Sequence, residues 1–254
     1  MRIVQTALDH VLSPLTLLTS LPIVRRRVDL PSASYGLFPV VGVLIGAILV
    51  ALDYGARLLL PSAASSALVV VGLVALTGAL HLDGLADSAD GLFGGRDRAH
   101  RLAIMRDPHN GAFAFAAIAA VLLLKWAALI PLEGWLRMGA LLLVPSLARW
   151  SVLLPMVLFP PARREGMAFE LRAGSDWRQA VFGSAFAVGL SLVVFWPAGL
   201  ALLAPALLAG LVVGAYAWGR LGGLTGDIFG AMVEVNEAIL LLLIATSVSH
   251  AWLT

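Results

Sequence analysis

The chain has 254 residues, of which 60% are hydrophobic and only 13% are charged. A soluble domain of this length would have too few polar side chains to cover its surface, so the composition predicts an integral membrane protein. The chain has no cysteine, which excludes disulfides and thiolate metal sites, and its formal net charge of +2 gives no reason to expect a nucleic-acid partner.

The apolar stretches predict an all-α fold. A helix needs roughly 20 apolar residues to cross the bilayer core. We therefore expect a polytopic helical bundle with about 6–7 transmembrane helices, over approximately 37–52, 63–82, 111–131, 138–159, 179–200, 201–219 and 229–250. Pro197 and Pro205 leave open whether the fifth and sixth stretches are two spans or one broken span.

The N-terminal segment over residues 3–24 is apolar but interrupted by polar residues and proline. This pattern predicts a short interfacial helix rather than a full crossing. No internal repeat and no long linker divides the sequence. We therefore interpret residues 1–254 as a single membrane-embedded domain.

The positions of the arginines predict the orientation in the membrane. If the arginine run at 25–27 is cytoplasmic and the chain then crosses seven times, three arginine-rich segments fall on the same side. These segments are 83–110, 160–178 and 220–228. The opposite side receives only Arg57 and Arg137, so we expect the polar segments to face the cytoplasm.

The segment HLDGLADSADGLFGG, residues 81–95, places three aspartates directly after the second apolar stretch. Asp83, Asp87 and Asp90 are spaced i, i+4, i+7 and fall within about a 60° arc of one helical face. Three carboxylates on one face repel one another unless a cation lies between them. Oxygen ligands at this spacing suit Mg²⁺ or Mn²⁺ together with substrate phosphate. The alternative is a solvated helix end, where aspartates act as caps and ordinary polar surface.

Basic residues follow the aspartates. Arg96, Arg98, Arg101 and Arg106 lie around the apolar positions of a short helix that we place along the membrane surface. Carboxylates that bind Mg²⁺ beside guanidinium groups suit phosphoryl transfer, because both neutralise phosphate charge. For each arginine the alternative is contact with lipid headgroups. The glycines of the motif are expected to let the backbone approach a bulky anion, or else to form loops.

A second polar constellation lies near the C-terminus, in GRLGGLTGDIFGAMVEVNEAILLLL. Its polar side chains are Asp227 after the glycines and then, inside the last span, Glu234, Asn236 and Glu237. Glu234 and Glu237 share a helical face, and acids at such depth indicate a functional site. A structural alternative pairs these acids with Arg149 or Lys125.

Several motifs together resemble one family. LHLDGLADSADGLFGGRDR, LAIMRDPHNGAF and GRLGGLTGDIFGA, with Glu237 downstream, are similar to the adenosylcobinamide-GDP ribazoletransferases, also called cobalamin 5′-phosphate synthases. LLTSLP at 17–22 and SYGLFPVVGVLIG at 34–46 resemble the opening segments of that family. The chain departs from the pattern at Ser88, where the family has Thr, and at DPHNG, where Ser and Arg more often follow the Asp.

The resemblance implies an enzyme of cobalamin biosynthesis in the cytoplasmic (inner) membrane of a prokaryote, with its active site facing the cytoplasm. Members of the family transfer the adenosylcobinamide-phosphate group of adenosylcobinamide-GDP to α-ribazole or its 5′-phosphate. They release GMP, form adenosylcobalamin or its 5′-phosphate, and need Mg²⁺. Membrane lipid is a further expected partner, and the resemblance leaves open whether the active unit is a homo-oligomer.

Applied to this chain, the resemblance gives Asp83, Asp87 and Asp90 the role of holding Mg²⁺. It leaves open whether Asp90 or Asp107 takes the proton of the attacking hydroxyl. The set of residues expected to bind substrate is His81, Arg96, Arg98, Arg106, Thr225, Asp227, Asn236 and Glu237.

Two other classes of membrane protein are weighed against this interpretation. A Mg²⁺-dependent phosphotransferase of the CDP-alcohol type also presents aspartates at helical spacing, but it places Ala-Arg after its first Asp-Gly pair, whereas here Ala86 is followed by Asp87. A cation transporter or channel would distribute acids across the membrane. In this chain most acids fall at one end, with Asp53 and Glu133 near the other.

Overall fold

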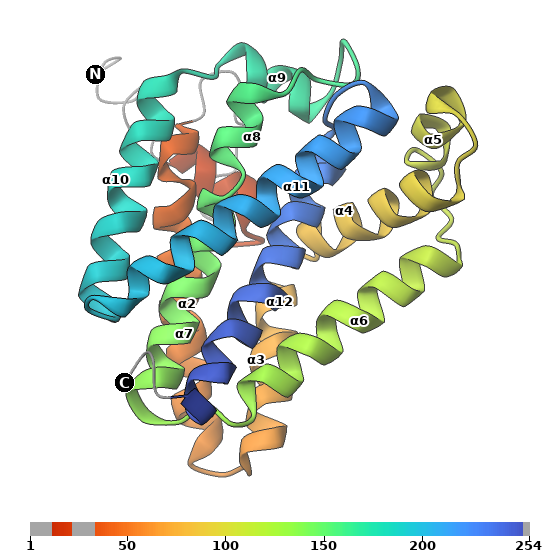
Figure 1. Ribbon diagram of the computed structural model, residues 1–254. Coiled ribbons are helices and arrows are strands. Elements are labelled where there is room, and N and C mark those ends of the chain that lie inside the picture. The colour runs from red at the N-terminus through yellow and green to blue at the C-terminus, as the bar shows by residue number, and fades with distance from the viewer. Residues whose placement is uncertain (1–11, 22–33, 251–254) are drawn as a thin grey trace.

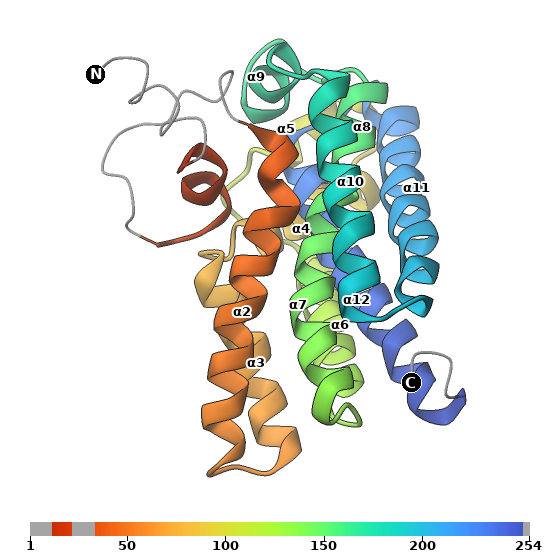
Figure 2. The same ribbon diagram turned by 90° about the vertical axis from the view of Figure 1, so that its left-hand side faces the viewer.

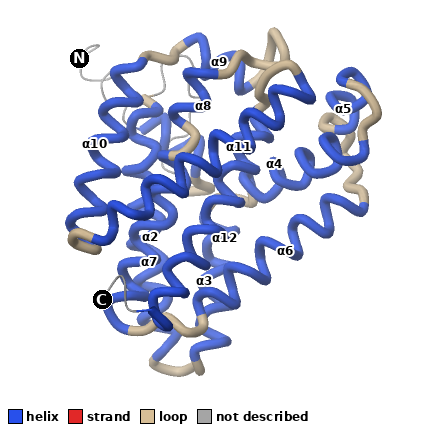
Figure 3. The backbone as a smooth tube through the Cα atoms, in the orientation of Figure 1, coloured by secondary structure: helices blue, strands red, loops and turns tan. Residues whose placement is uncertain are grey.

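The computed structural model describes residues 12–21 and 34–250, and every regular element in these ranges is a helix. Six of the described helical segments are long and apolar enough to cross a membrane, and a bent pair of helices raises the number to seven. Figure 1 shows these helices as one bundle, joined by the short loops drawn in tan in Figure 3. The prediction of an all-α polytopic bundle is therefore confirmed.

The α-helices are α2 (Phe38–Arg57), α3 (Ser62–Leu76), α4 (Leu80–Ala89), α5 (Arg98–Ile104), α6 (Ala112–Leu129), α7 (Gly134–Trp150), α8 (Leu153–Leu158), α9 (Met167–Ala173), α10 (Trp177–Val194), α11 (Leu203–Leu221) and α12 (Gly226–His250). Short 3₁₀ turns precede α2 (η2, Tyr35–Leu37) and α11 (η4, Ala198–Leu202), and a π-helical turn extends α4 (η3, Asp90–Gly94). The interfacial helix expected within 3–24 lies largely outside the described residues, which show one helix over 12–18.

Two spans form the centre of the bundle. The continuous span Gly134–Leu158 is 78% buried inside the protein and α12 is 72% buried, whereas α6, α10 and the span Ala198–Leu221 are between 22% and 28% buried. The peripheral helices expose large apolar side chains such as Leu123 and Val193, as expected of helices that face lipid. In Figure 2, α10 and α11 lie toward one edge of the bundle, and α2 and α3 lie toward the other.

The region around Pro197 contains two spans rather than one. α10 ends at Val194 and η4 leads into α11, so the boundary lies about one turn before the predicted division at residue 200. Trp196 and Pro197 occupy the turn, where proline provides no N–H to continue α10.

The second span differs from its prediction. A continuous helix over 63–82 was expected, but α3 ends at Leu76 and α4 departs at 88° to it. Gly78 and Ala79 have φ angles of 58° and 59°, a left-handed conformation that a right-handed helix cannot include. The 15 residues of α3 rise only about 22 Å, less than the roughly 30 Å hydrocarbon core. The aspartate stripe is therefore on a separate helix that turns away from α3.

Residue 20 closes the exposed end of α3. The Ser20 hydroxyl donates to the carbonyl oxygen of Ala75 at 2.7 Å, and the Ser20 backbone N–H donates to that of Leu76 at 2.8 Å. The Ala75 carbonyl oxygen also accepts from the backbone N–H of Gly78 at 3.1 Å, whereas the Leu76 carbonyl oxygen, which α3 leaves without a partner at its C-terminus, depends on Ser20. The described N-terminal segment therefore completes the hydrogen bonding at the break between α3 and α4.

A glycine pair holds α4 against α12. A methyl group on Gly84 would lie 2.8 Å from the backbone oxygen of Asp227 and 3.2 Å from the Cα of Gly230. A methyl group on Gly230 would lie 3.0 Å from the backbone oxygen of His81. Two backbones approach this closely only where side chains are absent. The crossing fixes the position of the first two aspartates relative to Asp227.

The three segments predicted to share one side of the membrane do lie together. Arg98 Nε donates to the carbonyl oxygen of Leu221 at 2.6 Å, and its Nη2 donates to that of Ala162 at 2.8 Å. One side chain thus joins segments 83–110, 160–178 and 220–228. The arginine run at 25–27, on which the cytoplasmic assignment depends, lies outside the described residues.

An ion pair fixes the opposite end of the bundle. Arg137 Nε and Nη2 donate to the two carboxylate oxygens of Asp53 at 2.7 and 2.6 Å, and Arg137 also contacts Ser66 at 3.1 Å. Both charged side chains are buried. This two-pronged pair ties α7 to α2 and α3, and it accounts for Asp53 without a transport path.

We predict that Gly84→Ala destabilises the protein by about 1–3 kcal/mol, because its methyl group meets rigid backbone of α12. Thermal unfolding in detergent measures the effect. Gly189→Ala on α10 is the matched control, since a methyl group there meets nothing within 4 Å. Equal unfolding temperatures for the two variants would contradict the close crossing.

Candidate functional site

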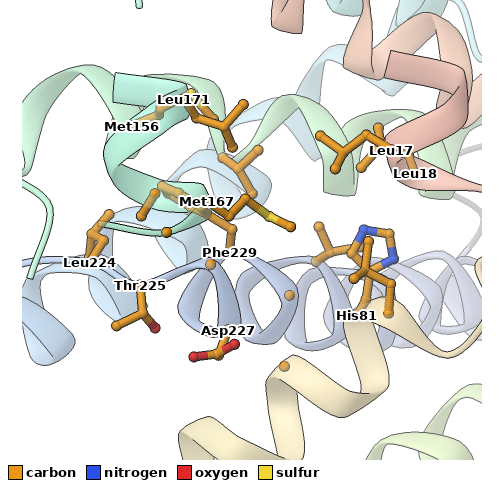
Figure 4. Close-up of a pocket in the computed structure, with 18 of the residues that line it drawn as sticks. Leu17, Leu18, His81, Met156, Met167, Leu171, Leu224, Thr225, Asp227 and Phe229 are labelled. Carbon is orange, nitrogen blue, oxygen red and sulfur yellow. The ribbon is translucent and has the colours of Figure 1, made fainter. Parts of the chain in front are cut away.

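A cavity opens between α4, α9, α12 and the start of α2, with a volume of about 180 Å³. Four of the residues predicted to form the site line it: His81, Asp83, Thr225 and Asp227. Figure 4 shows Thr225 and Asp227 at one end, His81 at the other, and Met167 and Phe229 between them. The cavity is thus polar at both ends and apolar in the middle.

Carboxylates gather at the exposed end of this cavity. Asp83 is exposed, and Asp87 and Asp227 are partly buried. The charges of Asp83, Asp227 and Asp90 all act on Asp87 and repel it. Asp83 and Asp87 of the predicted stripe therefore lie within electrostatic range of each other, and α12 adds the carboxylate of Asp227. Among the described residues, however, no group of three or more acidic, histidine or cysteine side chains is close enough to hold a metal ion as it stands.

Asp90 differs from the other two aspartates of the stripe. It is 8% exposed, and its carboxylate accepts hydrogen bonds from the backbone N–H groups of Gly111 at 2.5 Å and Ala114 at 3.0 Å. These are N–H groups at the start of α6 that the helix cannot satisfy itself. Asp90 therefore acts as a cap for a helix 21 residues further along the chain, the role that the structural alternative assigned to the stripe.

The predicted arginines have different roles in the structure. Arg98 is bound to two backbone carbonyls, as described above, and Arg106 forms a surface ion pair with Glu165 at 2.7 Å. Arg96 is exposed. None of these three arginines lines the cavity; at its exposed end the lining arginine is Arg163, which is attracted by the charges of Asp227 and Asp87. Sequence reasoning used Arg163 only as an orientation signal, although its place in a loop between two spans is compatible with a site residue.

Asp107 lies in the exposed loop before α6. Its carboxylate accepts hydrogen bonds from the backbone N–H of His109 at 2.9 Å, and its Oδ1 lies 2.7 Å from the ring Nδ1 of His109. The backbone hydrogen bond is the main cause that lowers the pKa of Asp107 below its ordinary value. A carboxylate with a lowered pKa is a weaker proton acceptor, so the geometry does not favour Asp107 as the base.

The acids of the last span form ion pairs. Lys125 Nζ lies 2.7 Å from Glu234 Oε2 and 2.5 Å from Glu237 Oε2, and Arg149 Nη1 lies 3.0 Å from Glu237 Oε1. All four side chains are buried. The alternative that paired these acids with Arg149 or Lys125 is confirmed for both partners. Glu237 is the member that joins the two cations, while Arg149 also lines the cavity.

Asn236 and the motif glycines support packing. Asn236 Nδ2 donates to the Ser151 hydroxyl at 2.9 Å, which ties α12 to the junction of α7 and α8. Gly91 faces Met105, where a methyl group would lie 2.3 Å from the Met105 Cγ. Gly84 faces α12, so these two glycines allow close packing, and the expected approach of the motif glycines to an anion stays a prediction.

Comparison with known proteins agrees with the motifs. A family model described as cobalamin-5-phosphate synthase matches residues 10–245. A protein of Pseudomonas paraeruginosa named adenosylcobinamide-GDP ribazoletransferase is 43% identical, with 94% of this chain and 98% of that protein covered. A protein of the same name from Chlorobium chlorochromatii is 38% identical, with 91% and 93% covered. No solved structure matches the chain significantly.

We expect Glu237→Gln to destabilise the protein by about 3–5 kcal/mol, because it leaves Arg149 buried without its carboxylate. Glu234→Gln should destabilise the protein less, since Lys125 keeps its ion pair with Glu237. Thermal unfolding of the two purified variants provides the comparison. Equal losses would show that Glu237 does not link the two cations.

Proposed function

Because the chain belongs to the cobalamin-5-phosphate synthase family, transferases of cobalamin biosynthesis, we propose that it transfers adenosylcobinamide phosphate from adenosylcobinamide-GDP to α-ribazole or its 5′-phosphate. The observation that carries this proposal is the gathering of Asp83, Asp87 and Asp227 with Arg163 beside one cavity. Acidic and guanidinium groups in this combination suit a pyrophosphate substrate.

In the proposed reaction a ribose hydroxyl oxygen of α-ribazole forms a bond to the corrinoid-side phosphorus of the pyrophosphate. The bond from that phosphorus to the bridging oxygen breaks, and GMP leaves with the electron pair. The hydroxyl proton passes to a base. The products are adenosylcobalamin, or its 5′-phosphate when the ribazole carries phosphate, and GMP.

The residues fit the Mg²⁺ that the family resemblance implies. Mg²⁺ usually binds proteins through one or two carboxylates and takes its remaining ligands from water and substrate phosphates, so a ready group of three acids is not required. We assign this ion to two of the three carboxylates of Asp83, Asp87 and Asp227, and not to Asp90, because Asp90 already caps α6. When bound, the ion would neutralise charge on the pyrophosphate.

Arg163 is proposed to contact the pyrophosphate from the side opposite the aspartates. It lines the same cavity as Asp227, and its Nη2 donates to the carbonyl oxygen of Leu102 at 2.9 Å, which holds the guanidinium in place. A positioned guanidinium stabilises the charge that develops on the non-bridging oxygens. Arg106, paired with Glu165 in the same region, would add to the positive potential.

We propose that this end of the bundle faces the cytoplasm of a prokaryotic cell, in the inner membrane. The segments that meet there carry most of the arginines of the chain, and positive residues favour the cytoplasmic side. The cavity then opens toward the compartment that contains nucleotides.

Asp87→Asn is expected to lower GMP release by at least about 100-fold, because a ligand and a charge next to the pyrophosphate are lost. The assay combines purified protein with adenosylcobinamide-GDP, α-ribazole and Mg²⁺. Glu133→Gln, at an exposed position before α7, is the matched control and should retain activity. A folded, membrane-inserted Asp87→Asn variant with full activity would overturn the assignment.

Asp107→Asn separates the two candidates for the base. Since Asp107 is exposed and bound to His109, we expect its loss to change the rate of GMP release by less than about threefold. A loss as large as that of Asp87→Asn, with an altered pH profile, would instead identify Asp107 as the proton acceptor.

A further inference from the structure

The buried end of the cavity contains an arginine with unused hydrogen-bond donors. Arg149 lines the cavity and is 0% exposed. Its Nη1 donates to Glu237 and to the carbonyl oxygen of Pro145, but Nε and Nη2 have no acceptor among the residues that the structure describes. Buried donors without an acceptor are unfavourable. A bound molecule that offers an acceptor at this point would therefore be stabilised.

The apolar middle of the cavity suits a flat aromatic group. Met156 and Phe229 are buried, and Met167 and Leu171 also line the cavity. Thioether and phenyl groups both make favourable contacts with aromatic rings. A ligand that suits this lining is mainly apolar and offers an acceptor to Arg149 on one edge.

The charges around the cavity favour a neutral ligand. Two cations, Lys125 and Arg149, already balance Glu234 and Glu237 at the buried end. At the exposed end three carboxylates, those of Asp83, Asp227 and Glu165, line the cavity beside one lining cation, Arg163, while Arg106 pairs with Glu165 at 2.7 Å. An anion would have to pass these carboxylates and would enter a region with no spare positive charge. A neutral nitrogen acceptor needs no counter-charge.

The volume of the cavity further limits which ligand it can hold. About 180 Å³ is less than the 300–1,000 Å³ typical of sites that enclose a whole drug-sized molecule. The corrin ring and a complete nucleotide are therefore too large. A guanine base carries donors and acceptors on several edges, whereas Arg149 and His81 are the polar side chains among the described residues at the buried end.

We propose that this cavity binds the benzimidazole base of α-ribazole, with the free ring nitrogen of the base accepting a hydrogen bond from Arg149. The apolar faces of the base would lie between Met156, Met167 and Phe229. Its ribose would then extend toward Asp83 and Asp227, where the proposed phosphoryl transfer takes place. This inference rests on the proposed function, and it assigns the acceptor substrate to one part of the site.

Two small probes of equal shape test the hydrogen bond. 1,5,6-Trimethylbenzimidazole has the ring acceptor, and 1,5,6-trimethylindole has a C–H in its place. By calorimetry, the wild-type protein should bind the benzimidazole about tenfold more tightly than the indole. Arg149→Lys keeps a charge opposite Glu237 but loses the planar donors, so it should abolish the preference while leaving indole binding unchanged. Equal binding of the two probes to the wild type would overturn the proposal.

A second variant tests the cavity without changing a residue of the buried ion pairs. Met167→Trp fills the middle of the cavity and should raise the KM for α-ribazole by about tenfold, with the KM for adenosylcobinamide-GDP within about twofold of wild type. Phe169→Trp, at an exposed position of the same helix, is the matched control and should change neither KM. A rise in the KM for adenosylcobinamide-GDP instead would assign the cavity to the nucleotide substrate and overturn the inference.

The two experiments separate this inference from the proposed function. If wild-type protein releases GMP but the probes bind equally, the transferase function stands and the base site is wrong. If wild-type protein releases no GMP, the proposed function fails, and the preference between the probes still decides whether the cavity binds a benzimidazole.

Discussion

The site depends on one contact, the crossing of α4 and α12 at Gly84 and Gly230. α4 leaves α3 at 88°, so α3 does not continue into α4, and the direction of α4 must be fixed by contacts with another helix. The absence of side chains at the two glycines lets its backbone lie directly against α12. That approach places the aspartates of one helix beside Asp227 of the other, and it sets His81 near the buried ion pairs. Acids that are 144 residues apart in the chain, Asp83 and Asp227, thus border one cavity.

Two buried arginines show how the bundle uses charge for different purposes. Arg137 donates two hydrogen bonds to Asp53 and further ones to Ser66 and a backbone carbonyl. Its donors are therefore satisfied, and its role is structural. Arg149 is equally buried but shares Glu237 with Lys125 and leaves two nitrogens without acceptors among the described residues. A buried polar group left unsatisfied in a native protein calls for an explanation such as a ligand. The difference separates an arginine that holds helices together from one suited to binding.

Much of the fold was predictable from the sequence because hydrophobic stretches determine spans directly. The break after Leu76 was not, since Ala79 in a left-handed conformation carries no signal in its residue type. In the site, spacing correctly grouped Asp83 with Asp87. It could not reveal that Asp90 caps α6, or that Arg163 lines the cavity while Arg98 does not, because these contacts join residues far apart in the chain. The sequence also predicted Lys125 or Arg149 as ion-pair partners of Glu234 and Glu237, and the structure contains ion pairs with both.

The contact of Ser20 with the last carbonyls of α3 bears on how the protein enters the membrane. A short helix with unsatisfied carbonyls is a poor substrate for insertion into lipid, because the hydrocarbon offers no donors. The segment that supplies those donors is synthesised before α3, since it precedes α3 in the chain. Translation therefore produces Ser20 before α3, and the hydrogen bonds of Ser20 to this end of α3 require no residue of the C-terminal helices.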